Sequence, residues 1–242
     1  MNKIQIFEST SQLFKTTADF ILELSERSIK EKGRFTIALS GGNTPKKLYE
    51  LLAKPPYIKK INWKNVFVFW SDERCVPASD EENNSHMAFL ALLNNVPVPA
   101  ENIFPVPVNF GPSKASIRYE QMIKSFFKTS KPSFDLILLG LGEDGHTASL
   151  FPGTEILLEN KALVKQVFLK NKKSYRISFT VPLINNAKHV LFLVTGIEKS
   201  VIIQKLMLKP VKRNIFPAQL IKPLKGDLHW FLDKPAAIKL NN

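Results

Sequence analysis

The chain contains a single cysteine, Cys75, among its 242 residues. One thiol cannot build an internal disulfide framework, and such sparse cysteine usage is typical of a reducing compartment. No apolar run approaches the ~20 residues needed to cross a bilayer. The first seven residues are too few and too polar to form a secretory signal. We therefore expect a cytoplasmic protein with no membrane partner.

Histidine is also scarce. Four histidines are scattered along the chain: His86, His146, His189 and His229. None of them pairs with another histidine at the spacing of a helical or finger-type ligand set. We therefore expect no bound metal.

Acidic residues are few relative to basic ones, 21 against 34, so the formal net charge is +13. Only six of the basic residues are arginine, whereas base-edge recognition relies on the bidentate arginine fork. The densest basic stretch, 161–176, contains no RNA-binding motif. Charge runs usually face water, so we interpret the excess as a lysine-rich surface and expect no nucleic-acid partner. A basic nucleic-acid-binding module is the alternative outside enzymes.

Short apolar strands alternate with amphipathic helices. We predict strands over 3–7, 35–39, 66–70, 103–106, 134–139, 163–169, 175–181, 189–194 and 227–232. We predict helices over 11–29, 45–53, 85–93, 114–127 and 198–208. This alternation favours an α/β fold, a mostly parallel sheet with helices on both faces. No repeat or linker interrupts the pattern, which predicts one domain over 1–242.

A glycine turn, Ser40-Gly41-Gly42-Asn43-Thr44-Pro45, follows the strand predicted over 35–39. Glycines let a ligand approach the backbone, and a helix amino terminus favours phosphate. We expect Thr44 to be the N-cap and Pro45 the first helical residue. An ordinary turn is the alternative. A serine nucleophile at Ser40 is disfavoured, because in a nucleophile elbow the helix begins directly after the serine.

Three ionisable residues, Asp72-Glu73-Arg74, follow the strand predicted over 66–70. In open parallel sheets, ligands bind beyond the carboxyl ends of the strands. Arg74 could hold an anion or stabilise negative charge that develops during a reaction. A surface salt bridge is the alternative.

The glycine-rich segment 140–154 begins where the strand predicted over 134–139 ends, and it contains Asp144 and His146. A carboxylate two residues before a histidine could orient the imidazole and stabilise its charged form. A lone histidine is more often structural, but the glycine-flanked position at a strand end favours a functional one. Two cations near later strand ends, Arg176 and Lys199, could neutralise a phosphate or simply face solvent.

Together these segments resemble the 6-phosphogluconolactonases, relatives of the glucosamine-6-phosphate deaminase/isomerases. The resemblance covers nearly the whole chain and rests on SGGNTP (40–45), FWSDERCVP (69–77), LLGLGEDGHTASLFPGT (138–154), LFLVTG (191–196) and WFLD (230–233). It implies a Rossmann-like fold and cofactor-free hydrolysis of 6-phospho-D-glucono-1,5-lactone to 6-phosphogluconate in the oxidative pentose phosphate pathway. The implied partner is this small sugar-phosphate lactone, and we expect a monomer or a weak homodimer.

The resemblance also assigns roles. It implies that His146 is the general base that activates water, with Asp144, Arg74 and Asp72 around the reacting carbon. The implied phosphate site consists of Gly41, Gly42, Asn43, Thr44, Arg176 and Lys199. One departure is Ser178, where the family pattern leads us to expect threonine. The deaminases carry a glutamate five residues after the histidine. Here that position is Phe151, which cannot carry a proton, so the deaminase alternative is disfavoured.

Overall fold

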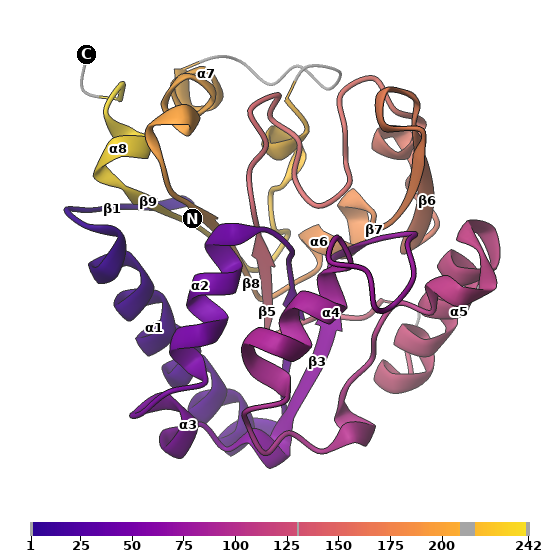
Figure 1. The fold of residues 1–242 in the computed structure, drawn as a ribbon, viewed down its shortest axis with the longest axis horizontal. Coiled ribbons are helices and arrows are strands. Elements are labelled where there is room, and N and C mark those ends of the chain that lie inside the picture. Colours follow the sequence, from indigo (N-terminus) through magenta and orange to yellow (C-terminus); the bar gives the residue numbers. More distant parts are fainter. Residues whose placement is uncertain (1, 130, 209–215, 241–242) are drawn as a thin grey trace.

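A six-stranded parallel sheet forms the centre of the molecule, in the order β1-β9-β8-β5-β2-β3. The computed structural model describes residues 2–129, 131–208 and 216–240. The strands of this sheet are β1 (Asn2–Phe7), β2 (Phe35–Leu39), β3 (Val66–Trp70), β5 (Leu136–Leu139), β8 (His189–Val194) and β9 (Asp227–Asp233). Because every neighbouring pair is parallel, the carboxyl ends of all six strands lie along one edge, and the arrows of β3 and β5 point upward in Figure 1.

A second, antiparallel sheet stands beside the first, in the order β4-β7-β6. Its strands are β4 (Asp72–Arg74), β6 (Val164–Leu169) and β7 (Ser174–Phe179). The segments predicted as strands over 163–169 and 175–181 therefore lie outside the parallel sheet. The connection between them is too short for the crossover that a parallel pair needs, so they form a hairpin.

Helices cover both faces of the central sheet, as predicted. Successive side chains of a strand point to opposite faces. On β3, Trp70 stacks with Phe89, directly after α4, while Phe69 contacts Phe126 of α5. Figure 1 shows α1, α2 and α4 side by side on one face. The α-helices are α1 (Thr10–Lys32), α2 (Asn43–Leu52), α3 (Tyr57–Lys60), α4 (Asn84–Ala88), α5 (Pro112–Phe127), α6 (Val181–Asn185), α7 (Ser200–Leu208) and α8 (Lys234–Ala237). Among the described residues, none of the helices is both long and apolar enough to cross a bilayer.

The predicted start of α2 is wrong. The helix begins at Asn43, and its N-cap is Gly42, with φ at 104° and no side-chain cap. The Lys46 N–H donates to the Gly42 carbonyl at 3.1 Å, so Thr44 lies inside the first turn and not before it. The Thr44 hydroxyl bonds the Thr195 hydroxyl, 2.7 Å away, in the loop after β8. The side chain thus joins two loops, and the first backbone N–H groups of α2 receive no side-chain cap.

The strand predicted over 103–106 is also wrong. The chain makes only an isolated parallel bridge between Val68 and Ile103, with the Phe104 N–H donating to the Val68 carbonyl at 2.8 Å. The ladder does not continue, because Trp70, the next residue of β3 that faces this side, donates its N–H to the Tyr119 hydroxyl at 2.8 Å and accepts from it at its carbonyl at 3.1 Å.

A cluster of titratable groups lies at the opposite, amino edge of the sheet. His189 begins β8 and His229 lies at the start of β9, so strand pairing brings together residues forty positions apart. Arg27 donates to His189 Nε2 at 3.0 Å, which places the ring proton on Nδ1, 3.3 Å from His229 Nε2. Asp227 Oδ2 lies 3.9 Å from His189 Nδ1. These three residues could each offer one metal-ligand atom. Sequence spacing cannot detect such a set.

Burial lowers the pKa of both imidazoles, to about 4 for His229. Because this value lies below the unfolded value of 6.5, the unfolded chain binds the proton more tightly than the folded chain. The stability contributed by the neutral ring is therefore present above pH 6.5 and is lost as the pH falls toward 4. The full contribution is at most about 3 kcal/mol, since one pKa unit is worth ~1.4 kcal/mol.

We expect the free energy of unfolding of the wild type to fall more than that of His229→Gln between pH 8 and pH 5, by about 1–2 kcal/mol. Glutamine keeps a polar group at this position but does not titrate. Urea denaturation at both pH values measures the difference. An equal fall in the two proteins would show that His229 is not held neutral by the fold.

Candidate active site at the carboxyl edge of the sheet

A cavity of about 410 Å³ opens at the carboxyl edge of the central sheet. Its walls are the loops that follow β2, β3, β5 and β8, four strands that converge on this edge. Most residues that the sequence analysis selected line it: Gly41, Gly42, Asn43, Thr44, Asp72, Arg74, His146 and Lys199. This edge is where parallel α/β sheets bind their ligands.

Two selected residues, Asp144 and Arg176, do not line this cavity. Asp144 lies behind His146, on the wall of a neighbouring cavity of about 710 Å³. Arg176 is buried on β7 and pairs in register with Arg74 of β4.

His146 and Asp144 form the closest polar pair of the site. His146 Nδ1 lies 2.5 Å from Asp144 Oδ1, and the His146 backbone N–H donates to the same oxygen at 3.1 Å. An ionised carboxylate only accepts hydrogen bonds, so Nδ1 carries the proton and Nε2 of the neutral ring has a free lone pair. Partial burial would raise the pKa of Asp144, but the hydrogen bonds from His146 outweigh it and the pKa lies below its ordinary value. The pair thus leaves on Nε2 the lone pair that a base requires.

Gly142 makes room for this pair. A Cβ at this position would lie 2.0 Å from His146 Nδ1 and 2.7 Å from Asp144 Oδ1, much closer than real contacts. The Gly142 N–H donates to the His146 carbonyl at 2.9 Å, which closes the loop on itself. The glycine is therefore required by the close approach of the imidazole.

Asp72 is held from two sides. Its Oδ2 accepts a hydrogen bond from the Ser149 hydroxyl at 2.7 Å, and its carbonyl accepts one from the Asn84 amide at 2.9 Å. The Ser149 N–H donates to the Ser178 hydroxyl at 3.1 Å, so serine meets the hydrogen-bonding need at the position where threonine was expected. Ser149 and Asn84 are not predicted as supports of Asp72, because no local pattern distinguishes them from other small polar residues.

Glu73 anchors β4 from inside the protein. Its side chain is fully buried, and it accepts backbone N–H groups of Arg74, Asn84 and Ser85 at 2.7–2.8 Å. Burial raises the pKa of Glu73 to about 7, although these three donors oppose the shift. Side chains alternate along a strand, so Glu73 points away from the face that carries Asp72 and Arg74. It ties that strand to the start of α4.

Two arginine side chains, Arg74 and Arg176, lie side by side at one wall of the cavity. The Arg74 guanidinium donates to the Glu82 carbonyl at 2.7 Å, and Arg176 stands beside it on the paired strand. Arg176 is only 6% exposed, and its Nη1 has no partner within the described residues. Burial, and then the charge of Arg74, lower the pKa of Arg176. Within the same part of the chain, neither guanidinium forms an ion pair with a carboxylate, so both keep a charge that an anion could neutralise.

The remaining cations stand on other sides of the cavity. Lys199 lies after β8, and its Nζ is 3.8 Å from Glu143 Oε1. Lys172, from the turn between β6 and β7, also lines the cavity. Lys172 is not among the predicted phosphate-site residues, since the hairpin that folds it over the cavity cannot be read from charge alone.

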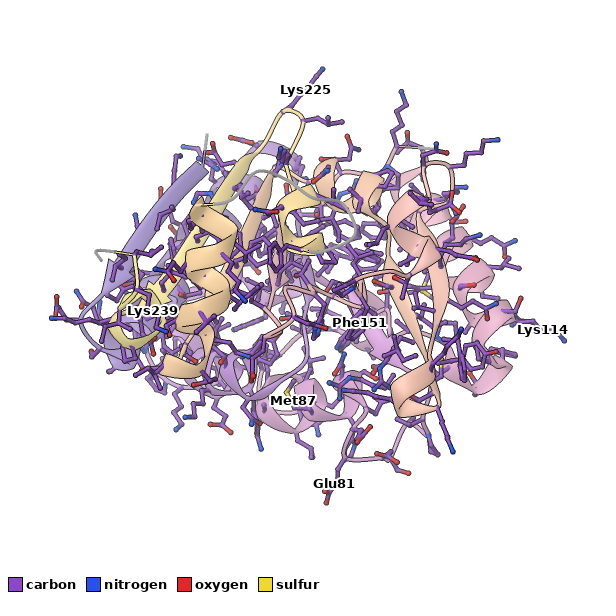
Figure 2. All side chains as sticks on the ribbon, turned by 90° about the horizontal axis from the view of Figure 1, so that it is seen from above. Glu81, Met87, Lys114, Phe151, Lys225 and Lys239 are labelled. Atoms are coloured by element: carbon purple, nitrogen blue, oxygen red, sulfur yellow. The ribbon has the colours of Figure 1, made fainter. Side chains whose placement is uncertain are left out.

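Replacing Glu73 by Gln should lower the free energy of unfolding by about 1–3 kcal/mol at pH 8. The amide NH₂ of glutamine is a donor, so at least one backbone N–H that Glu73 accepts in the wild type would lose its acceptor. Urea denaturation measures this change. Glu81→Gln is the matched control, because Glu81 is exposed and projects away from the molecule in Figure 2. Equal stability of Glu73→Gln and the wild type would mean that the three N–H contacts contribute nothing.

Comparisons with known proteins agree on one family. The model of the family described as "Glucosamine-6-phosphate isomerases/6-phosphogluconolactonase" matches residues 8–230. A 6-phosphogluconolactonase of Nostoc sp. is 39% identical over 98% of this chain and 98% of its own length. One from Synechocystis sp. is 42% identical over 88% of each chain.

Solved structures show the same fold. The 6-phosphogluconolactonase from Trypanosoma cruzi superposes with a TM-score of 0.89 at 32% identity, over 100% of this chain and 98% of its own. A monomeric glucosamine-6-phosphate deaminase superposes with a TM-score of 0.82 at 22% identity, over 98% of this chain and 99% of its own. The second match shows the fold alone.

Proposed function

Because this chain belongs to the glucosamine-6-phosphate isomerase/6-phosphogluconolactonase family, we propose that it hydrolyses 6-phospho-D-glucono-1,5-lactone to 6-phosphogluconate in the oxidative pentose phosphate pathway. One observation supports this most directly. The His146–Asp144 pair offers a basic Nε2 beside a cavity whose walls carry cations. Such a site suits the attack of water on an anionic ester.

The proposed reaction begins at His146. Nε2 removes a proton from water as the oxygen attacks the lactone carbonyl carbon. Arg74, or a backbone N–H of the glycine loops, stabilises the oxyanion that forms. The tetrahedral intermediate then collapses, and the ring oxygen leaves with the proton that His146 returns. A positioned base contributes roughly 10²–10⁴-fold and one oxyanion donor about 10²–10³-fold.

The two aspartates have separate roles in this proposal. Asp144 sets the tautomer of His146 and stabilises the imidazolium that forms after proton removal. Asp72, which also lines the cavity, orients the lactone, since Ser149 occupies one of its oxygens and leaves the other for a substrate hydroxyl.

We propose that the phosphate binds at the amino end of α2. Gly41, Gly42, Asn43 and Thr44 line the cavity there, and the helix has no side-chain cap. Free N–H groups and the helix dipole favour an anion. Lys199 on the cavity wall and Arg176, behind that wall beside Arg74, supply the charge. The Nη1 of Arg176 has no partner among the described residues, which supports its role. A cytoplasmic location, a monomeric or weakly dimeric state and the absence of a nucleic-acid partner are part of the same proposal.

The function is tested by the hydrolysis rate of freshly prepared lactone, measured against its spontaneous rate. We expect clear acceleration by the wild type. His146→Gln should lower kcat by about 10²–10⁴-fold without changing the thermal midpoint, because it removes the base and little packing. A wild-type rate equal to the spontaneous one, or ammonia release from glucosamine 6-phosphate at a comparable rate, would overturn the assignment.

The phosphate site is tested with two substrates. Arg176→Ala and Lys199→Ala should each raise KM for the phosphorylated lactone about 10–100-fold, since a charged hydrogen bond is worth ~1.5–3 kcal/mol. With unphosphorylated gluconolactone, KM should hardly change. Lys165→Ala is the control, because Lys165 pairs with Glu159 away from the cavity. Equal penalties on both substrates would place the two cations outside the phosphate site.

A further inference from the structure

Phe151 stacks on the ring of His146. The two ring centroids lie 4.1 Å apart, and the planes differ by 23°. Asp144 contacts the Nδ1 edge of the same imidazole. His146 is thus held by a hydrogen bond at one edge and by an apolar ring on one face.

The hydrogen bond alone leaves one freedom. It constrains one distance, whereas two side-chain torsions place the ring, so a coupled change of χ1 and χ2 can still tilt the imidazole. The Asp144 side chain is itself 49% exposed, which makes it a weak anchor. A flat ring against the imidazole face prevents this tilt. Phe151 therefore determines the plane in which Nε2 lies.

The Phe151 backbone is itself fixed. Its carbonyl accepts hydrogen bonds from the Thr154 N–H at 3.3 Å and from the Thr154 hydroxyl at 2.6 Å. The preceding residue, Leu150, is fully buried and donates its N–H to Thr147. A buried residue on one side and a closed turn on the other keep the aromatic ring in place.

Phe151 also stands between two cavities. His146 lines the cavity of about 410 Å³, whereas Phe151 and Asp144 line the neighbouring one of about 710 Å³. Figure 2 looks down on this edge and labels Phe151 near its centre. The larger cavity continues over Phe168 and Lys170 of the β6 hairpin. Removal of the Phe151 ring would join the two spaces and bring water to the back of the imidazole.

We propose that Phe151 is a positioning residue for the reaction: its ring fixes the plane of His146, so that Nε2 faces the lactone carbonyl, and it closes the back of the catalytic base to water. This inference rests on the proposed lactonase function. A purely structural Phe151 would contribute to stability but not to the turnover of the folded enzyme.

The test compares three substitutions on lactone hydrolysis. Phe151→Ala should lower kcat about 10–100-fold, as a base misplaced by ~1 Å does, while KM stays within about twofold. Phe151→Tyr keeps the flat ring and should recover most of kcat. Phe151→Leu fills similar space without a flat face and should stay well below Tyr. Phe168→Ala is the matched control, because its ring lines the larger cavity and contacts Tyr175 rather than His146.

A second readout does not depend on activity. The carbon-bound ring protons of His146 should shift in the proton NMR spectrum of Phe151→Ala, because the ring current of the phenyl group is lost. Phe168→Ala should leave them unchanged. Unchanged resonances in Phe151→Ala would overturn the stacking on which the proposal rests.

The outcomes separate the two proposals. A wild type without lactonase activity removes the proposed function, whatever the NMR result. An active wild type with a folded Phe151→Ala that retains kcat overturns the positioning role alone. Equal losses in the Ala and Tyr variants, or a rise in KM at unchanged kcat, would also overturn it.

Discussion

The site depends on the parallel pairing of β3, β2, β5 and β8. Leu39 is in register with Trp70, and Leu139 with Phe192, so neighbouring strands end at nearly the same height. Each loop that follows therefore starts from one line along the sheet. Residues more than a hundred positions apart, such as Thr44 and Thr195, therefore meet there. The ladder hydrogen bonds define the cavity, and the loops supply its chemistry.

The second constraint acts at Ser71, where the chain passes from one sheet to the other. The Ser71 N–H donates to the Leu39 carbonyl at 2.8 Å, and its carbonyl accepts from the Phe179 N–H at 2.8 Å. One residue thus closes the parallel ladder and opens the antiparallel one. The strand beyond it, β4, turns Asp72 and Arg74 toward the cavity and brings Arg176 alongside. The side-by-side position of Arg74 and Arg176 follows from this junction.

The sequence predicts the positions of the strands better than it predicts which distant residues contact one another. Continuous apolar runs such as 35–39 and 189–194 were placed correctly, because burial on both faces leaves a local signature. The N-cap assigned to Thr44 was wrong because α2 begins at Asn43, and the partner of the Thr44 hydroxyl, Thr195, lies in a distant loop. Ser149 and the His189–His229 contact could not be foreseen for the same reason: both depend on which strands pair, and pairing is not encoded by local spacing.

The larger cavity is not the better candidate for the reaction, and the reason is energetic. Features that cost folding free energy gather around the smaller one: two arginines side by side, and a buried guanidinium nitrogen without a partner among the described residues. Ala148, with φ at 46°, lines the same cavity. Such departures persist where a ligand or a reaction compensates for them. Asp144 and Phe151 line the larger cavity and contact His146 from that side, so the larger cavity adjoins the site without containing the imidazole.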